Sequence, residues 1–143
     1  MENHFKFFTS VQVRFVETDA QGHVFFGHYF TYYDVALTEY LKAIGYSYQE
    51  MLADGVDFYY LEASCQYKDR AFFDEILHIH ARIGKIGNTS FHFEFSVVEE
   101  SSGRLIATGR IVAVAVDRNS RKPIAVPQKL REAVESFEAA AAS

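Results

Sequence analysis

The sequence predicts an α+β fold in which an antiparallel five-stranded sheet wraps around one long buried helix. Three features of the chain predict this fold: apolar and polar residues alternate along several segments, one segment has apolar residues at helical spacing on most sides, and short turn sequences separate the later strands. Short connections make consecutive strands antiparallel neighbours. Because a sheet with one apolar face must be covered, the apolar helix is the obvious cover.

Alternation with a period of two indicates half-buried strands, with the odd-numbered positions on the apolar face. The last of five such segments is apolar on both faces after Arg110. It is therefore a central strand, or a strand whose second face is buried by another subunit. If the hairpin around Gly87–Asn88 places both apolar sets on one face, Arg82 lies opposite Glu94. The predicted strands are Val11–Phe15, Tyr59–Tyr67, Leu77–Ile83, Phe91–Val97 and Leu105–Val116.

The long helix lies between the first two strands. It begins near Phe26 to Tyr29, and Gly45 is a plausible C-terminal stop. Its apolar positions follow i, i+3, i+4, i+7 spacing and leave little polar surface, which is typical of a buried helix. A short helix is expected around Tyr48–Ala53, and Pro127 can open a final helix. The apolar stripe of that final helix comprises Leu130, Val134 and Phe137.

Composition excludes several classes of protein. A chain of 143 residues with 49% hydrophobic and 23% charged residues is typical of one folded domain, here expected over residues 1–143. The net charge of −5 disfavours nucleic acid as a partner. One cysteine excludes an internal disulfide framework and fits a reducing, cytoplasmic compartment. No apolar run reaches the roughly 20 residues of a membrane span. Met1 to Ser10 lacks an uninterrupted apolar stretch of signal-peptide length, so we expect no signal peptide there. An aromatic content of 16% indicates a bulky core, an apolar ligand pocket, or both.

The segment from Glu17 to Phe30 carries the most chemical information. Asp19 follows the first strand, Gly22 permits a tight turn, and the helix starts a few residues later. The first N–H groups of a helix have no partner within it, and the helix dipole is positive at this end. The segment therefore combines a carboxylate, as base or nucleophile, with a site for a developing negative oxygen.

This segment reads D-x-x-G-H-V-F-x-x-x-Y-F from Asp19 to Phe30 and precedes an aromatic-rich helix. It resembles the 4-hydroxybenzoyl-CoA thioesterase-like group of hotdog-fold acyl-CoA thioesterases, which includes small bacterial thioesterases encoded near the Tol-Pal system. The resemblance covers nearly the whole chain. It implies hydrolysis of an acyl-CoA thioester to a free acid and coenzyme A, with no metal or redox cofactor. It also implies a homodimer, which in this family often pairs into a homotetramer, so that dimer and tetramer both stay open from sequence.

By that resemblance Asp19 is the catalytic carboxylate, acting as a nucleophile or as a general base for water. Phe26 occupies the position whose backbone N–H polarises the thioester carbonyl. Some relatives have histidine at this position and tyrosine at the position of Phe15, so their side-chain assistance to catalysis is not implied here. The remaining substrate-binding candidates are Gly27 and Tyr29 at the helix start, and Lys85, Arg121 and Lys122 for the phosphates of coenzyme A, with Arg118 beside them.

Other interpretations remain open from sequence. The chain could act on acyl carrier protein, or bind acyl-CoA without cleaving it. Asp19 could simply cap a turn, and Asp34 or Glu39 on the long helix is the alternative catalytic carboxylate. Three imidazoles, those of His78, His80 and His92, could bind zinc, although a solvated or interface face is favoured. Cys65 is expected to be buried as a small apolar residue.

Overall fold

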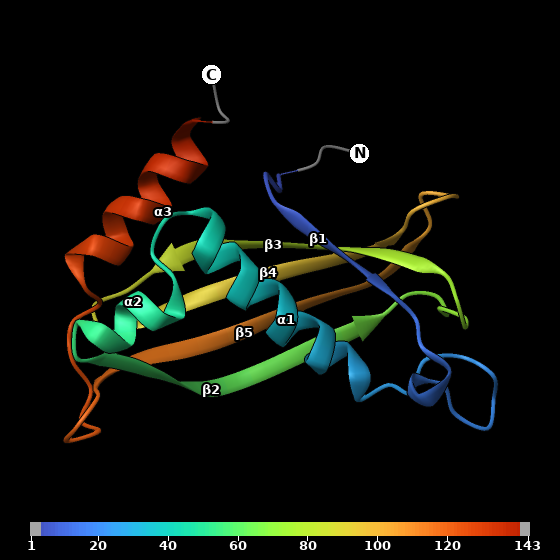
Figure 1. Ribbon diagram of the computed structural model, residues 1–143, viewed down its shortest axis with the longest axis horizontal. Helices are drawn as coiled ribbons and strands as arrows, with labels where there is room; N and C mark the ends of the chain where they lie inside the picture. Colours follow the sequence, from blue (N-terminus) through green and yellow to red (C-terminus); the bar gives the residue numbers. More distant parts are fainter. Residues whose placement is uncertain (1–3, 141–143) are drawn as a thin grey trace.

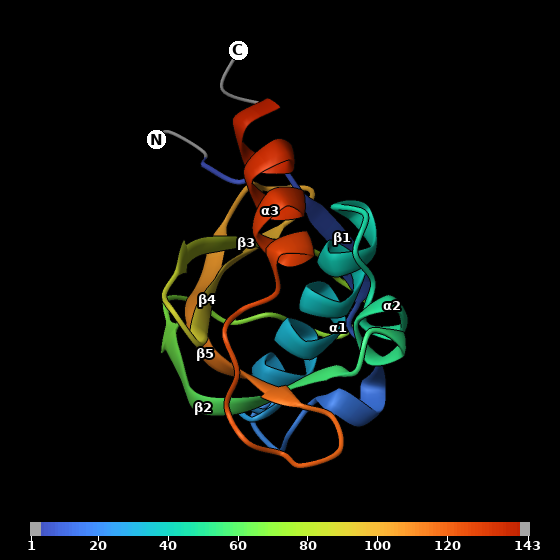
Figure 2. The ribbon, with the colours of Figure 1, turned by 90° about the vertical axis from the view of Figure 1, so that its left-hand side faces the viewer.

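The computed structural model of the chain describes residues 4–140. These residues form one antiparallel sheet of five strands in the order β1-β3-β4-β5-β2. Helix α1 lies across one face of the sheet (Figure 1), and the end-on view in Figure 2 shows the sheet curving around it. In chain order the elements are β1 (Phe8–Gln12), the 3₁₀ turn η1 (Phe15–Glu17), α1 (His28–Ala43), α2 (Tyr48–Ala53), β2 (Val56–Tyr67), β3 (Ile76–Ile86), β4 (Ser90–Glu99), β5 (Leu105–Asp117) and α3 (Gln128–Ala140).

Helix α1 is the centre of the core, as its apolar spacing predicts. Tyr33 and Tyr40 have no exposed surface, although each carries a hydroxyl group that needs a partner. The Tyr33 hydroxyl contacts Cys65 Sγ at 3.2 Å, and the Tyr40 hydroxyl accepts a hydrogen bond from the Ile83 N–H at 3.2 Å. The helix ends as predicted, with Gly45 in the left-handed region at φ 92°.

The hairpin of β3 and β4 confirms the predicted alternation. In both strands the odd positions are buried toward the helix, from Leu77 to Ile83 and from Phe91 to Val97. Arg82 pairs with Glu94 in the register, and the Arg82 Nε atom donates to Glu94 Oε1 at 2.7 Å. Strand β5 lies between β4 and β2, so the first alternative, a central strand, is confirmed.

The first strand begins and ends earlier than predicted. It spans Phe8–Gln12, and the predicted segment Val11–Phe15 continues into the turn η1. Val13 is buried at 1% exposure, but Phe15 is 77% exposed, so its inward orientation was wrong. The turn forms because the Glu17 side chain accepts a hydrogen bond from the Arg14 N–H and turns the chain away from the sheet.

The predicted phase of β2 was wrong in its first half. A β-bulge between Tyr60 and Glu62 shifts the register with β5. Before the bulge, even positions face α1: Phe58 packs on the core, and the Tyr60 hydroxyl binds Asp34. After it, odd positions face α1, as Cys65 does. The inserted residue reverses the alternation, because every side chain changes face when the register moves by one.

The C-terminal segment confirms the predicted final helix. Helix α3 starts at Gln128, directly after Pro127, and buries Leu130 and Val134. Within residues 4–140, no helix combines the length and the apolarity needed to cross a membrane.

Candidate active site

The loop from Thr18 to Phe26 is held rigidly at one end of the sheet. The beginning of the loop pairs with its later part, and the later part also pairs with the segment that follows β2. Three hydrogen bonds between backbone atoms hold the loop in place. The three bonds, each 2.9 Å long, run from Asp19 N–H to the His23 carbonyl, from Phe25 N–H to the Glu17 carbonyl and from Val24 N–H to the Ala71 carbonyl.

Asp19 lies at the start of the tight turn predicted from Gly22. The Gly22 N–H donates to the Asp19 carbonyl at 2.9 Å, with Gly22 at φ 85°. One carboxylate oxygen, Oδ1, accepts from the Gln21 N–H at 2.8 Å, so Asp19 also caps the turn. Within residues 4–140 its other oxygen accepts no hydrogen bond. Asp19 borders a cleft of about 500 Å³ whose other walls include the exposed side chains of Phe15, Val16 and Phe73.

The start of α1 leaves two backbone donors open. The N–H groups of the first helical turn are already used, since His28, Tyr29 and Phe30 each donate to the carbonyl three residues earlier. The N-cap residue is Gly27, which has no side chain to cap the helix. Across the described part of the chain, neither Phe26 N–H nor Gly27 N–H meets a hydrogen-bond acceptor. These two donors lie at the positive end of the helix dipole, where a negative oxygen is stabilised.

Tyr67, which the sequence did not single out, contacts this same peptide. Its hydroxyl donates to the Phe26 carbonyl at 3.0 Å across 41 residues of sequence. Its ring packs edge-on against Tyr29, with ring centroids 5.3 Å apart. Tyr29 itself is only 3% exposed, and burial raises its pKa to about 12, so in this single chain it belongs to the core.

Glu17 is a second residue that sequence reasoning did not identify as important. It is 4% exposed, and its carboxylate accepts hydrogen bonds from the Arg14 backbone N–H, the Arg14 guanidinium and the Tyr32 hydroxyl. Burial alone would raise the pKa of Glu17, but these hydrogen bonds outweigh it and lower the pKa. The buried carboxylate thus fixes the strand end from which the Asp19 loop departs.

The basic candidates lie at the other end of the sheet from the Asp19 loop (Figure 1). Lys85 is exposed near the β3–β4 turn, and Lys122 is exposed in the turn after β5. Arg121 lies over the Tyr59 ring at 5.3 Å and its Nη1 atom is 3.8 Å from Asp57 Oδ2. One chain therefore does not bring these cations to Asp19.

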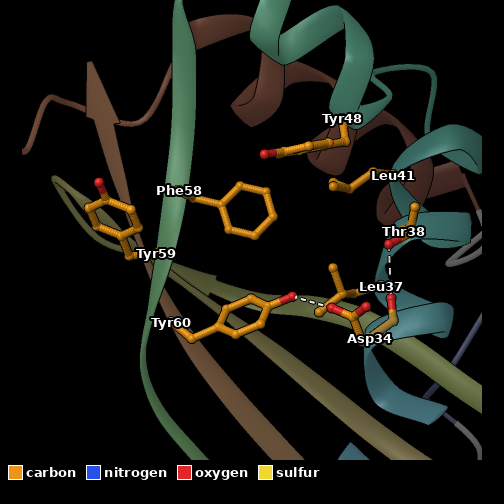
Figure 3. Close-up of a pocket in the computed structure, with 8 residues that line it drawn as sticks. All are labelled: Asp34, Leu37, Thr38, Leu41, Tyr48, Phe58, Tyr59 and Tyr60. Carbon is orange, nitrogen blue, oxygen red and sulfur yellow. Dashed lines mark hydrogen bonds between the residues drawn. The ribbon is translucent and has the colours of Figure 1, made fainter. Parts of the chain in front are cut away.

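The alternative carboxylate Asp34 borders a separate pocket of about 420 Å³ between α1, α2 and β2 (Figure 3). Its Oδ1 atom accepts a hydrogen bond from the Tyr60 hydroxyl at 2.7 Å. Leu37 and Phe58 supply apolar walls. Glu39, by contrast, forms an ion pair with Lys42 at 3.0 Å on the helix surface.

His78, the first of the histidines considered for zinc on the outer face of the sheet, contacts other side chains. His78 Nε2 lies 3.0 Å from Glu100 Oε2, and the His78 ring stacks on Phe8 with centroids 4.2 Å apart. The structure groups no three His, Cys, Asp or Glu side chains of residues 4–140 in a metal-binding arrangement.

Comparison with known proteins identifies the family. A family model described as the thioesterase-like superfamily matches residues 13–134. A crystal structure of a hypothetical protein from Aquifex aeolicus superposes with a TM-score of 0.82 at 29% identity, over 90% of this chain and 98% of that one. The chain therefore belongs to the thioesterase-like superfamily and has the hotdog fold, as its motif predicted.

Two curated relatives indicate a more specific group within this superfamily. A putative esterase of Aquifex aeolicus is 31% identical over 111 residues, which make up 72% of this chain and 87% of that protein. The acyl-CoA thioester hydrolase YbgC of Escherichia coli is 30% identical over 120 residues, or 84% of this chain and 89% of that protein. These matches confirm the resemblance to the 4-hydroxybenzoyl-CoA thioesterase-like group.

Proposed function

We propose that the protein hydrolyses an acyl-CoA thioester to a free carboxylic acid and coenzyme A. The observation that carries the proposal is the pair of open N–H groups on Phe26 and Gly27, at the start of α1, on a loop that also holds Asp19. The relatives named above, one of them an acyl-CoA thioester hydrolase, support this substrate class.

In the proposed reaction the thioester carbonyl oxygen accepts hydrogen bonds from these amides. Negative charge grows on that oxygen as the carbonyl carbon becomes tetrahedral, so the donors stabilise the transition state more than the ground state. Asp19 then acts in one of two ways. As a nucleophile, its carboxylate adds to the carbonyl carbon, the thiolate of coenzyme A leaves, and water cleaves the resulting anhydride to the free acid and the Asp19 carboxylate. As a general base, it takes a proton from a water molecule that adds to the carbonyl carbon, and the tetrahedral intermediate then expels the thiolate, which takes up that proton.

We further propose a homodimer joined along β2, which can pair into a homotetramer. Strand β2 is an edge of the sheet, is 12 residues long and exposes Tyr59, Tyr60 and Leu61, features that favour strand pairing with a second copy. Antiparallel pairing of two β2 strands would set the beginning of one against the end of the other. The Arg121–Lys122 turn of one protomer would then approach the Phe26 loop of its partner, where the phosphates of coenzyme A need cations. Lys85 lies farther from this edge and is the weaker candidate.

Two other functions are distinguished by thiol release from acyl-CoA, with acyl carrier protein added as a competing substrate. A thioesterase for acyl carrier protein would prefer that protein-bound substrate over free acyl-CoA. A non-catalytic module would bind acyl-CoA without releasing thiol. The single cysteine supports a reducing, cytoplasmic compartment for any of the three.

The test is thiol release from a panel of aromatic, short-chain and long-chain acyl-CoAs by wild type and Asp19→Asn. Asparagine keeps an Oδ1 atom for the Gln21 N–H, so the turn is preserved while the base or nucleophile is lost. We expect hydrolysis at least ~100-fold slower, the lower scale for a positioned acid–base group. A residue that only caps the turn would leave the rate unchanged, and that result would remove Asp19 from the mechanism.

Two comparison variants sharpen the assignment. Asp34→Asn tests the alternative carboxylate, and a selective loss of activity there would move the site to the pocket in Figure 3. Glu132→Gln removes an exposed carboxylate on α3 and should retain full activity.

A further inference from the structure

The Phe26–Gly27 peptide is held by one hydrogen bond from outside the loop. The Tyr67 hydroxyl donates to the Phe26 carbonyl at 3.0 Å, whereas the helix's own bond to that carbonyl, from the Tyr29 N–H, is 3.4 Å long. The phenol therefore makes the shorter of the two contacts that orient this peptide.

The sheet fixes the position of the Tyr67 backbone and of its ring. Its backbone pairs with Ala107 at the end of the β2–β5 ladder, and the next residue continues the contact, with Lys68 N–H donating to the Ile106 carbonyl at 2.9 Å. The ring packs edge-on against Phe26 as well, with centroids 6.4 Å apart and planes at 83°. The phenol thus connects the rigid sheet to the start of α1.

Orientation of the Phe26 carbonyl decides where one open donor points. The Phe26 carbonyl and the Gly27 N–H belong to the same planar peptide, so holding one holds the other. Gly27 has no side chain to restrain this plane, and no residue of the described chain accepts a hydrogen bond from its N–H. A hydrogen bond to the carbonyl also polarises the peptide and strengthens its N–H as a donor.

We propose that Tyr67 is a positioning residue for thioester hydrolysis, which keeps the Phe26–Gly27 peptide aimed at the substrate's carbonyl oxygen. The inference rests on the proposed function and adds a residue from β2 to it. Tyr67 does not transfer a proton to substrate, since its hydroxyl proton is committed to the Phe26 carbonyl. Burial raises the pKa of Tyr67 to about 12, so the hydroxyl remains a donor throughout the neutral pH range.

The experiment compares Tyr67→Phe with Tyr46→Phe. Both variants remove one tyrosine hydroxyl hydrogen bond, but Tyr46 donates to Asp54 near α2, remote from the Asp19 loop. For Tyr67→Phe we expect kcat to fall about 10-fold, less than the 100-fold or more for removing an oxyanion donor outright, with KM within about twofold. For Tyr46→Phe we expect unchanged kcat. In ¹⁵N–¹H spectra, the Gly27 amide resonance should move in Tyr67→Phe and remain in place in Tyr46→Phe.

The outcomes separate this inference from the proposed function. Unchanged kcat in Tyr67→Phe, in an enzyme that Asp19→Asn inactivates, overturns the role of Tyr67 alone. If kcat falls equally in both tyrosine variants, in proportion to their loss of thermal stability, Tyr67 has only a structural role, and the positioning role is overturned as well. A wild-type chain that releases no thiol from any acyl-CoA overturns the proposed function and this inference together.

Discussion

Gly109 of β5 offers a sharp test of how α1 sits on the sheet. Gly109 lies between Phe95 of β4 and Cys65 of β2 in the register, directly beneath the Tyr33 ring of α1. That ring stacks on Phe95 with centroids 4.4 Å apart and planes at 14°. A Cβ atom added at Gly109 would lie 2.6 Å from Tyr33 Cζ and from its hydroxyl oxygen. The absent side chain is therefore the space that the ring occupies.

Gly109→Ala should destabilise the fold substantially. Overpacking a core typically costs about 1–3 kcal/mol, and the upper end is expected because the obstructed group is a fully buried ring, not the end of a flexible side chain. For a chain of this length, ~3 kcal/mol lowers the melting temperature by roughly 10 °C. Urea unfolding followed by circular dichroism measures the free energy directly.

A double-mutant cycle identifies the cause. Tyr33→Leu removes the ring, so in that background Gly109→Ala should cost less than about 1 kcal/mol, giving a coupling energy near 2 kcal/mol. The cycle also cancels the effect of alanine on the unfolded chain. A cost for Gly109→Ala that is the same in both backgrounds, or no cost in the wild-type background, would refute the packing argument.

Three further predictions follow from other contacts. Hydrogen bonds from the Ser102 and Ser101 side chains and N–H groups lower the pKa of Glu99 to about 2. The stabilisation that these bonds give the fold is present above the ordinary glutamate pKa and is lost as pH falls from there toward 2. Glu99→Gln should therefore unfold at a lower urea concentration at pH 7 and show a flatter dependence of the urea midpoint on pH in acid, and a dependence as steep as that of wild type contradicts this. Glu17→Gln should lower the free energy of unfolding by about 1–3 kcal/mol, as measured by thermal unfolding, because it turns an amide N–H₂ toward the donors of Arg14 and Tyr32. A stability equal to that of wild type would argue against a stabilising role of this hydrogen-bond network. Leu61 is 64% exposed on the edge strand β2, where the proposed dimer would bury it. In Leu61→Glu each of the two copies loses about 1 kcal/mol of apolar burial, so the dimer Kd should rise ~30-fold or more. Sedimentation velocity measures the dimer Kd, and an unchanged value would place the interface elsewhere.

Local patterns in the sequence were sufficient where sheet pairing was regular. The alternation from Leu77 to Ile83 and from Phe91 to Val97 predicted which faces are buried, and with the short turn it also predicted the pairing of Arg82 with Glu94. The start and end of α1 followed from helical spacing and from Gly45. These features depend on residues close in sequence, so periodicity alone contains the information.

Features set by distant contacts were not readable. The bulge after Tyr60 lies in the unbroken apolar run Phe58–Leu61, where apolar character does not tell which face a residue takes, so the alternation read from Glu62 onward was extended back to one face throughout. Phe15 reads as the last apolar residue of a strand, but the Glu17 carboxylate turns the chain before it. Tyr67 reads as one more alternating residue, since its partner lies 41 residues away.

The two open amides lie just before the first turn of α1, at a helix start that has no capping side chain. Serine, threonine, aspartate or asparagine at an N-cap accepts from the N–H of the second or third helical residue, here Tyr29 or Phe30, and stabilises the helix by about 1 kcal/mol. Gly27 forgoes that stabilisation and places no side chain beside its own N–H or that of Phe26, and neither N–H has an acceptor in the described chain. An uncapped helix start would normally fray, but here backbone bonds from Phe25 to Glu17 and from Val24 to Ala71, together with the Tyr67 hydroxyl, hold it from outside. The loop can therefore present unsatisfied donors in a fixed direction, which is the property that stabilisation of an oxyanion requires.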